Sequence, residues 1–175
     1  MKSKATGKKV AIALLVVFSC MAAVMFFLAF GVTEMGKVIY DESNTIEYAA
    51  TYQRMEEAEN KKGYLVYFDE YDFSFHLLKA TVISYDNLEK LEAGTSVTIR
   101  IWDMYEEVLE KSEAENIPLV TFKAGVAEIV SFESSNREEE SGRTKAKITG
   151  IVAAVGFLVG ALVCVIMLVK VSKKN

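Results

Sequence analysis

Two long runs without a charged residue, one near each end of the chain, constrain the fold more than any other feature. They cover residues 10–32 and 148–169. A helix rises about 1.5 Å per residue, so each run forms a helix of roughly 33–35 Å, enough to cross a hydrocarbon core of about 30 Å. The sequence therefore predicts a membrane protein with two transmembrane helices and a central segment, residues 33–147, between them.

Charged residues are segregated between the tails and this central segment. Residues 1–9 and 170–175 carry seven lysines and no acidic residue, whereas all 24 acidic residues lie in 33–147. The other 13 of the 20 basic residues also lie there, which gives the central segment a net charge of −11. Lysine beside a span favours the cytoplasmic side. We therefore expect a multi-pass protein of the plasma membrane with both termini cytoplasmic and the central domain extracytoplasmic. The basic residues in 143–147 oppose this orientation, but long segments translocate largely regardless of charge.

The first run has two other interpretations. A cleaved signal peptide has an apolar region of about 7–15 residues. Residues 29–31 could form a cleavage site, but this run is longer than that. A lipoprotein signal would place polar residues after Cys20, and the chain stays apolar there. Cys20 and Cys164 both lie within the runs, so the central domain has no cysteine and must be held together by its own core.

Alternation of β-branched or aromatic residues with polar ones predicts several strands in the central segment. Residues 96–102 alternate cleanly. Residues 64–68 and 73–78 are separated by a short acidic turn, and residues 119–122 and 127–132 by a turn that contains a glycine. Both pairs read as hairpins.

Two short helices are predicted between and after these strands. Asp86 with Glu89, and Asp103 with Glu106, fit the capping-box spacing, and Gly94 stands where the first helix would end. Residues 45–60 fit a strand and also a helical face. We prefer the strand, because antiparallel strands need a further partner to close a small barrel.

Together these elements predict a mainly β domain with one or two short helices, arranged as a small, partly closed barrel of the OB type. The expected organisation is a tail (1–9), a first span (10–32), a connector (33–44), the β-rich domain (45–133), an extended or fraying polar linker (134–147), a second span (148–169) and a tail (170–175).

The stretches GYLVYFDEYDFSFHLL, LEKLEAGTSVTIRI and IPLVTFKAGVAEIVSFESSN, with the two-span layout, carry a resemblance. The chain resembles small uncharacterised bacterial membrane proteins with two spans and an OB-like, β-rich extracytoplasmic domain between them. The resemblance covers the domain and the layout, and its motifs consist mostly of core and turn residues. It implies no activity.

Aromatic residues provide the best candidates for ligand contacts in the domain. An exposed aromatic face on an OB-like barrel can bind glycans, peptides or single-stranded nucleic acid, and the charge of −11 disfavours nucleic acid. The alternative is that the rings pack the core and barrel wall. The candidate residues are Tyr64, Tyr67, Tyr71 and Trp102.

Small residues in the spans predict close helix packing, either between the two spans or across a homodimer. In the second span they follow a GxxxG pattern extended by one further step, and in the first span they share its spacing; these residues are Gly156, Gly160 and Cys164, with Ser19 and Ala23.

No catalytic signature accompanies this architecture. His76 is the only histidine, and the nucleophile-elbow, P-loop and GxGxxG patterns are absent from the sequence. Asp69, Glu70 and Asp72 share a turn but not the spacing of an EF-hand loop. We therefore expect no cofactor, no metal and no enzymatic activity. The expected function is that of a membrane-anchored interaction module, which contacts the lipid bilayer and another membrane or envelope protein or itself. The alternative is a small-ligand or cation sensor coupled to the two helices.

Overall fold

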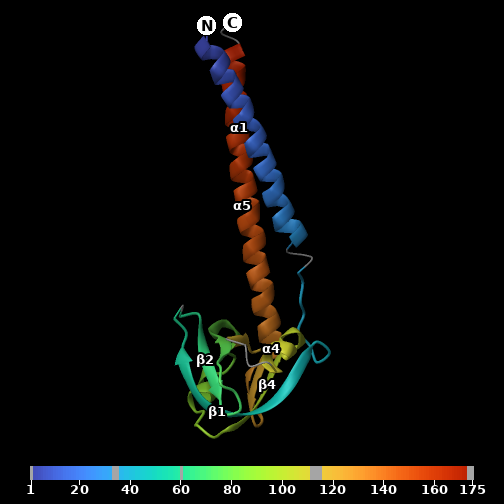
Figure 1. Cartoon of the computed structure of the whole chain (residues 1–175), viewed down its shortest axis with the longest axis vertical. Helices are drawn as coiled ribbons and strands as arrows, with labels where there is room; N and C mark the ends of the chain where they lie inside the picture. The colour runs from blue at the N-terminus through green and yellow to red at the C-terminus, as the bar shows by residue number, and fades with distance from the viewer. Residues whose placement is uncertain (1, 33–35, 60, 111–115, 173–175) are drawn as a thin grey trace. The chain divides into compact units, whose positions relative to one another are not determined.

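The structure is a computed structural model that describes residues 2–32, 36–59, 61–110 and 116–172. It divides into a helical unit, residues 1–37 and 141–175, and a β unit, residues 38–140 (Figure 1). Parts of the expected tails and connector, namely residues 1, 33–35 and 173–175, lie outside the described residues. The helices are α1 (Lys2–Phe27), the π-helical η1 (Leu28–Val32), η2 (Lys79–Thr81), α3 (Tyr85–Glu89), η3 (Asp103–Tyr105), α4 (Glu106–Glu110) and α5 (Phe132–Ser172). The strands are β1 (Thr45–Glu57), β2 (Gly63–Phe68), β3 (Phe75–Leu78), β4 (Ser96–Trp102), β5 (Ile117–Pro118), β6 (Thr121–Ala124) and β7 (Ala127–Val130).

The helical unit consists of α1 with η1 and the greater part of α5. Both helices are long and apolar enough to cross a membrane, as the sequence predicts. They run antiparallel, because Ala29 approaches Gly150 while Phe18 approaches Gly160. Apart from the seam between them, their apolar side chains lie on the outside; Leu158, for example, is 56% exposed.

Helix α5 contradicts the extended linker expected over residues 134–147. It is one helix of 41 residues that begins directly after β7 and continues to Ser172. Its first nine residues belong to the β unit and the rest to the helical unit. The polar segment that lacks an apolar stripe is therefore ordered as helix, and it joins the β unit to the apolar run without a break.

The β unit is built on a seven-stranded sheet with the order β5-β3-β2-β1-β4-β6-β7. The long strand β1 organises it (Figure 1). Its first half pairs with β4, from Thr45 opposite Trp102 onward, and its second half pairs with β2. A register shift between Tyr52 and Arg54 marks the change of pairing. The strand interpretation of residues 45–57 is thus confirmed.

Among the described residues the strand order is open and no continuous ladder closes the sheet into a barrel, so the β-rich sheet is confirmed and the partly closed barrel of the OB type stays a prediction. Two links nevertheless connect its distant strands. Residues 117–124 form the first link. They contain β5, which pairs in parallel with β3, and β6, which pairs antiparallel with β4. A single bridge joins Val82 to Val130 of β7.

The core lies on one face of this sheet. Along β4, Val97, Ile99 and Ile101 are buried while the residues between them are not. Phe68 and Phe122, from β2 and β6, pack edge to face with ring centroids 6.1 Å apart. Burial of apolar side chains, at about 25 cal/mol per Å² of apolar surface, is the main stabilising contribution here, since the unit contains no cysteine.

The predicted hairpins and short helices are present, with changes at their ends. The turn between β6 and β7 is the two-residue Gly125–Val126, where Gly125 has a φ of +58°, as the first position of a type II′ turn requires. Helix α3 is capped by Ser84, whose hydroxyl accepts from the amide of Asn87, and not by Asp86. Gly94 has a positive φ but lies beyond the cap at Lys90.

Candidate functional site

The four aromatic candidates do not form one face of the β unit. Tyr71 packs into the core, with its ring centroid 5.1 Å from that of Phe75, and burial raises the pKa of its phenol. Tyr64 also packs against the core, whereas the ring of Tyr67 lies under Arg54, 3.9 Å from the guanidinium carbon. Trp102 lies elsewhere, at the end of β4. A single aromatic binding platform is therefore not formed by these residues.

A shallow groove of about 460 Å³ lies beside His76. It is lined by Ala58, Glu59, Leu65, His76 and Asn116. A side chain at Gly63 would bring its Cβ within 2.5 Å of His76 Nε2, so the glycine provides the space for the imidazole. Carboxylate, imidazole and amide groups around an apolar floor could hydrogen-bond a small polar ligand.

The acidic turn between β2 and β3 has a local structural role. The carboxylate of Glu70 accepts hydrogen bonds from the amide and the hydroxyl of Thr51, at 2.8 and 2.7 Å. These bonds, chiefly the one from the amide, lower the pKa of Glu70. Among the residues that the structure describes, no three His, Cys, Asp or Glu side chains are grouped to hold a metal ion. Glu70 thus ties this turn to β1.

The seam between α1 and α5 is built from small residues at heptad spacing. Ala22 on α1 and Ala29 on η1 lie seven residues apart, as do Ala154 and Ala161 on α5, and each is at most 7% exposed. A repeat of seven keeps one face of each helix against the other in a left-handed pair. Among the glycines of α5, Gly150 is the most tightly packed, since an added Cβ would lie 2.7 Å from that of Ala29.

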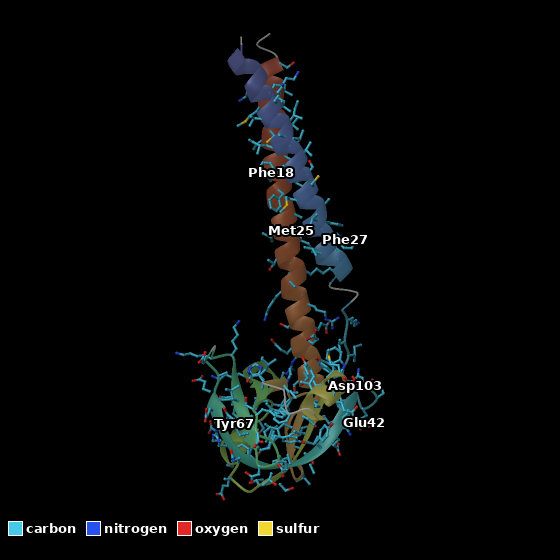
Figure 2. The ribbon with its side chains drawn as sticks, viewed as in Figure 1. Phe18, Met25, Phe27, Glu42, Tyr67 and Asp103 are labelled. Atoms are coloured by element: carbon cyan, nitrogen blue, oxygen red, sulfur yellow. The ribbon has the colours of Figure 1, made fainter. Side chains whose placement is uncertain are left out.

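Only some of the residues expected to pack the spans against each other lie in this seam. Cys164 is buried in it, and Gly160 lies at its edge, with the ring of Phe18 3.2 Å from an added Cβ (Figure 2). Gly156 has no neighbour within 4 Å of an added Cβ and does not contribute to the contact with α1. Ser19 and Ala23 line an apolar groove of about 430 Å³ beside the seam.

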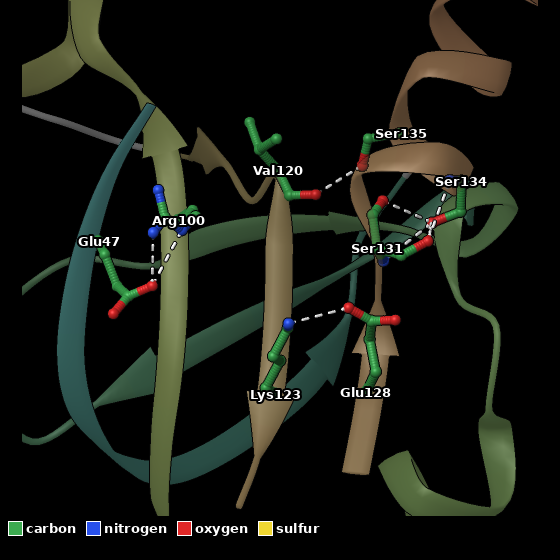
Figure 3. Close-up of polar contacts among 8 residues, drawn as sticks. All are labelled: Glu47, Arg100, Val120, Lys123, Glu128, Ser131, Ser134 and Ser135. Atoms are coloured by element: carbon green, nitrogen blue, oxygen red, sulfur yellow. Dashed lines mark hydrogen bonds and ion pairs between the residues drawn. The ribbon is translucent and has the colours of Figure 1, made fainter. Parts of the chain in front are cut away.

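The start of α5 is a group of polar contacts that sequence reasoning missed. Ser131 and Ser134 form a reciprocal cap, in which each hydroxyl accepts from the other residue's amide, at 3.2 and 3.1 Å (Figure 3). The buried hydroxyl of Ser135 donates to the carbonyl of Val120 at 2.7 Å. The S-x-x-S spacing was the available signal, since the bonds have the reciprocal form of a capping box with serine at the position where glutamate or glutamine usually stands.

The first turn of α5 also contacts the segment that precedes β1. The amide of Tyr40 donates to Asn136 Oδ1 at 2.7 Å, and Asn136 Nδ2 donates to the carbonyl of Tyr40 at 2.9 Å. The Tyr40 ring meets Trp102 edge to face, and burial, with Glu139 nearby, raises the pKa of the Tyr40 phenol. We call this two-bond contact between Tyr40 and Asn136 the clamp.

Arg100 also contacts the region around the start of α5. Arg100 of β4 forms an ion pair with Glu47 at 2.7 Å, and its guanidinium carbon lies 5.8 Å from the centre of the Phe132 ring (Figure 3). The side chain of Arg100 is 18% exposed and that of Glu47 54%, so the pair is open to solvent on the carboxylate side and contributes modestly, as surface pairs do. It links β1 and β4 to the first residue of α5.

Comparison with known proteins gives no relative. The chain matches no protein-family model, no curated protein and no solved structure.

Proposed function

We propose that the protein is a membrane-anchored interaction module of the plasma membrane. In this proposal α1 and α5 cross the bilayer, both termini are cytoplasmic, and the acidic β unit lies outside. The observation that carries it is the outward apolar surface of the helical unit, where Phe27 is 61% and Val152 65% exposed. Such a surface is stable in lipid, and the backbone of a helix is satisfied there internally.

The lysine-only tails support the orientation, since lysine beside a span favours the cytoplasmic side. The chemistry of the β unit supports a non-enzymatic role, because the polar groups described above mainly cap helices and tie turns to strands. Its partners in this proposal are the bilayer and another membrane or envelope protein or a second copy. The OB-like interpretation belongs to the same proposal. It is supported by the path of residues 117–124 between β3 and β4.

Cysteine labelling tests the topology. Val126 is fully exposed at the tip of the β6–β7 hairpin, and Gly7 is exposed near the start of α1. In a protein with Cys20→Ala and Cys164→Ala, an impermeant maleimide should label Val126→Cys in intact cells and leave Gly7→Cys unlabelled until the membrane is permeabilised. Labelling of Gly7→Cys alone in intact cells would reject the proposed orientation, and labelling of both only after permeabilisation would reject an outer β unit.

A sensor coupled to the helices is the second candidate, and the continuity of α5 favours it. A ligand in the groove beside His76 would act on the same unit whose last strand leads directly into α5. A thermal shift of the full-length protein in detergent on addition of Ca²⁺ or envelope glycans, lost in His76→Ala, would support the sensor over the simple module.

A further inference from the structure

The long strand β1 leaves part of one edge of the sheet open. Its first half pairs with β4 on this edge. The last bonds there belong to Tyr52, whose amide donates to the carbonyl of Thr95 at 2.9 Å and whose carbonyl accepts from the amide of Gly94 at 2.8 Å. Beyond this point the strand continues to Glu57, and among the described strands only β2, on the opposite edge, pairs with it.

The direction of the backbone groups shows which residues face the open edge. The amide of Ala58 donates to the first residue of β2 at 3.0 Å. Backbone groups alternate between the two edges of a strand, so Glu56 and Arg54 also face β2. The amides and carbonyls of Met55 and Glu57 therefore face the open edge. Within the described part of the chain, these four groups have no hydrogen-bond partner on that side.

The two outer strands of the sheet are protected in ways that this edge is not. Strand β5 has only two residues, and one of them is Pro118, which has no amide proton to offer. Strand β7 is covered, since Val82 bridges it and the amide of Ile83 donates to the carbonyl of Ile129 at 2.9 Å. An open edge is a template for another strand. Residues 53–57 are therefore the part of the described sheet best suited to pair with one.

The charges along this edge complement themselves under a two-fold rotation. Arg54 and Glu56 lie on the outer face, each 53% exposed, with Arg54 Nε 2.9 Å from Glu56 Oε1. Met55, between them, points to the other face and packs against the core. In an antiparallel pair of two copies with Met55 on the axis, Arg54 of each copy lies opposite Glu56 of the other. The four side chains then alternate in sign, and each pair of opposite charges stabilises the ladder.

This register is favoured over its neighbours. The next antiparallel registers that keep the open edges facing each other centre on Arg54, on Glu56 or on Glu57. Each of them places a charged side chain directly opposite its own copy, which is unfavourable. A protective row of one charge, such as lysines, would repel a second copy in every register. The mixed signs at positions 54 and 56 instead favour one register.

We propose that the protein forms a homodimer through β1, in which residues 53–57 of two copies pair antiparallel about Met55. The inference rests on the proposed interaction module and names a second copy as its partner. A ladder of five residues is short, but two copies held in one bilayer meet at a raised effective concentration. The labelling experiment above does not involve this edge, so a wrong orientation and a missing dimer would be separate results.

Disulfide cross-linking of the full-length protein in liposomes, with Cys20→Ala and Cys164→Ala, tests the register. The Cα atoms of a hydrogen-bonded antiparallel pair lie about 5.5 Å apart, which suits a disulfide. Mild oxidation should therefore join two copies of Met55→Cys. Ala49→Cys is the matched control, because Ala49 is exposed on the half of β1 that pairs with β4. This variant should stay unlinked.

Charge reversal tests the partner. Arg54→Glu or Glu56→Arg, each added to Met55→Cys, places like charges opposite each other and should lower the linked fraction by about fivefold or more. Both side chains are exposed, so neither change should unfold the β unit. When the two variants are reconstituted together with tags of different size, every pair across the axis has opposite charges again. The mixed dimer should then return to the yield of the Met55→Cys protein, which an ion pair within one copy cannot produce.

Three results would overturn the proposal. One is a Met55→Cys protein that stays unlinked, or links no more than Ala49→Cys. Another is a mixed dimer that forms no better than the dimer of either charge variant alone. The third is a disulfide between Met55→Cys and a different protein in native membranes without the dimer, which would assign the edge to that protein and not to a second copy.

Discussion

The two units of this protein are specified by opposite uses of apolar side chains. The β unit places them inward, with Ile99 and Phe122 fully buried, and leaves an acidic exterior. The helical unit places large apolar residues outward and small ones, such as Ala29 and Gly150, at the contact between helices. Water drives the first arrangement, whereas close packing alone must hold the second when lipid surrounds it.

The difference predicts how each unit responds to substitution. A buried position of the β unit should be intolerant of charge, because its stability comes from excluding water. A seam position of the helical unit should be intolerant of size, because its stability comes from close approach of backbones.

Ile99→Asp should unfold the β unit and leave the helices intact. Ile99 is fully buried at the centre of β4, and an unpaired carboxylate there costs several kcal/mol against a total stability of about 5–15 kcal/mol for a typical domain. Limited proteolysis of the full-length protein in detergent should show rapid cleavage within residues 45–130. Ser96→Asp, at an exposed position of the same strand, is the control and should resist cleavage like the wild type. Equal resistance of both variants would contradict the buried-core assignment.

Gly150→Ile should separate the apolar helices, with an intermediate effect for Gly160→Ile and none for Gly156→Ile. Added atoms at Gly150 meet Ala29 at once, those at Gly160 meet one movable ring, and those at Gly156 meet nothing. Extending the antiparallel register from Ala29 opposite Gly150 predicts that Leu15 lies opposite Cys164, so disulfide formation in Leu15→Cys, with Cys20→Ala, measures the contact. We expect weakened rather than abolished cross-linking, since such packing contributes modestly. If the three isoleucine variants cross-link equally, the seam is not the contact that holds the helices.

Glu70 should give the smallest effect, and it should depend on pH. Hydrogen bonds from Thr51 lower its folded-state pKa, so its contribution to stability is present above the unfolded value near 4.5 and is lost as pH falls through the lowered value. The melting temperature of Glu70→Gln should therefore lie slightly below that of the wild type at pH 7. The two should converge at low pH. A difference that persists undiminished at pH 2 would exclude this origin.

Most of the β unit could be predicted from local pattern. Residues 96–102 alternate so regularly that β4 was located to the residue, because one face is buried and the other is not. The strand β5 was missed, since two residues around Pro118 carry no periodicity and pair only through a distant partner. The links between distant strands likewise depend on long-range pairing, which alternation does not encode.

Local sequence pattern could not predict the helix at the polar start of α5 or the residues of the seam, for different reasons. Residues 134–147 lack an apolar face, and the helix there is set by its cap at Ser131 and by continuation into the apolar run. In the seam, the glycine spacing drew attention to Gly156, but the heptad spacing of alanines on both helices decides which face is buried. The clamp joins residues too distant in sequence for any local rule to find.

The pairing pattern of the β unit also sets an order of events during synthesis. The ladder between β1 and β4 can form only after Trp102, the partner of Thr45, has been synthesised. The ladder between β3 and β5 likewise requires Ile117, the partner of Phe75. The last strand ends at Val130, immediately before α5, so the sheet is complete only when nearly all of the chain up to the second apolar helix has left the ribosome. The sheet is therefore completed late in synthesis, long after the residues of α1 have left the ribosome.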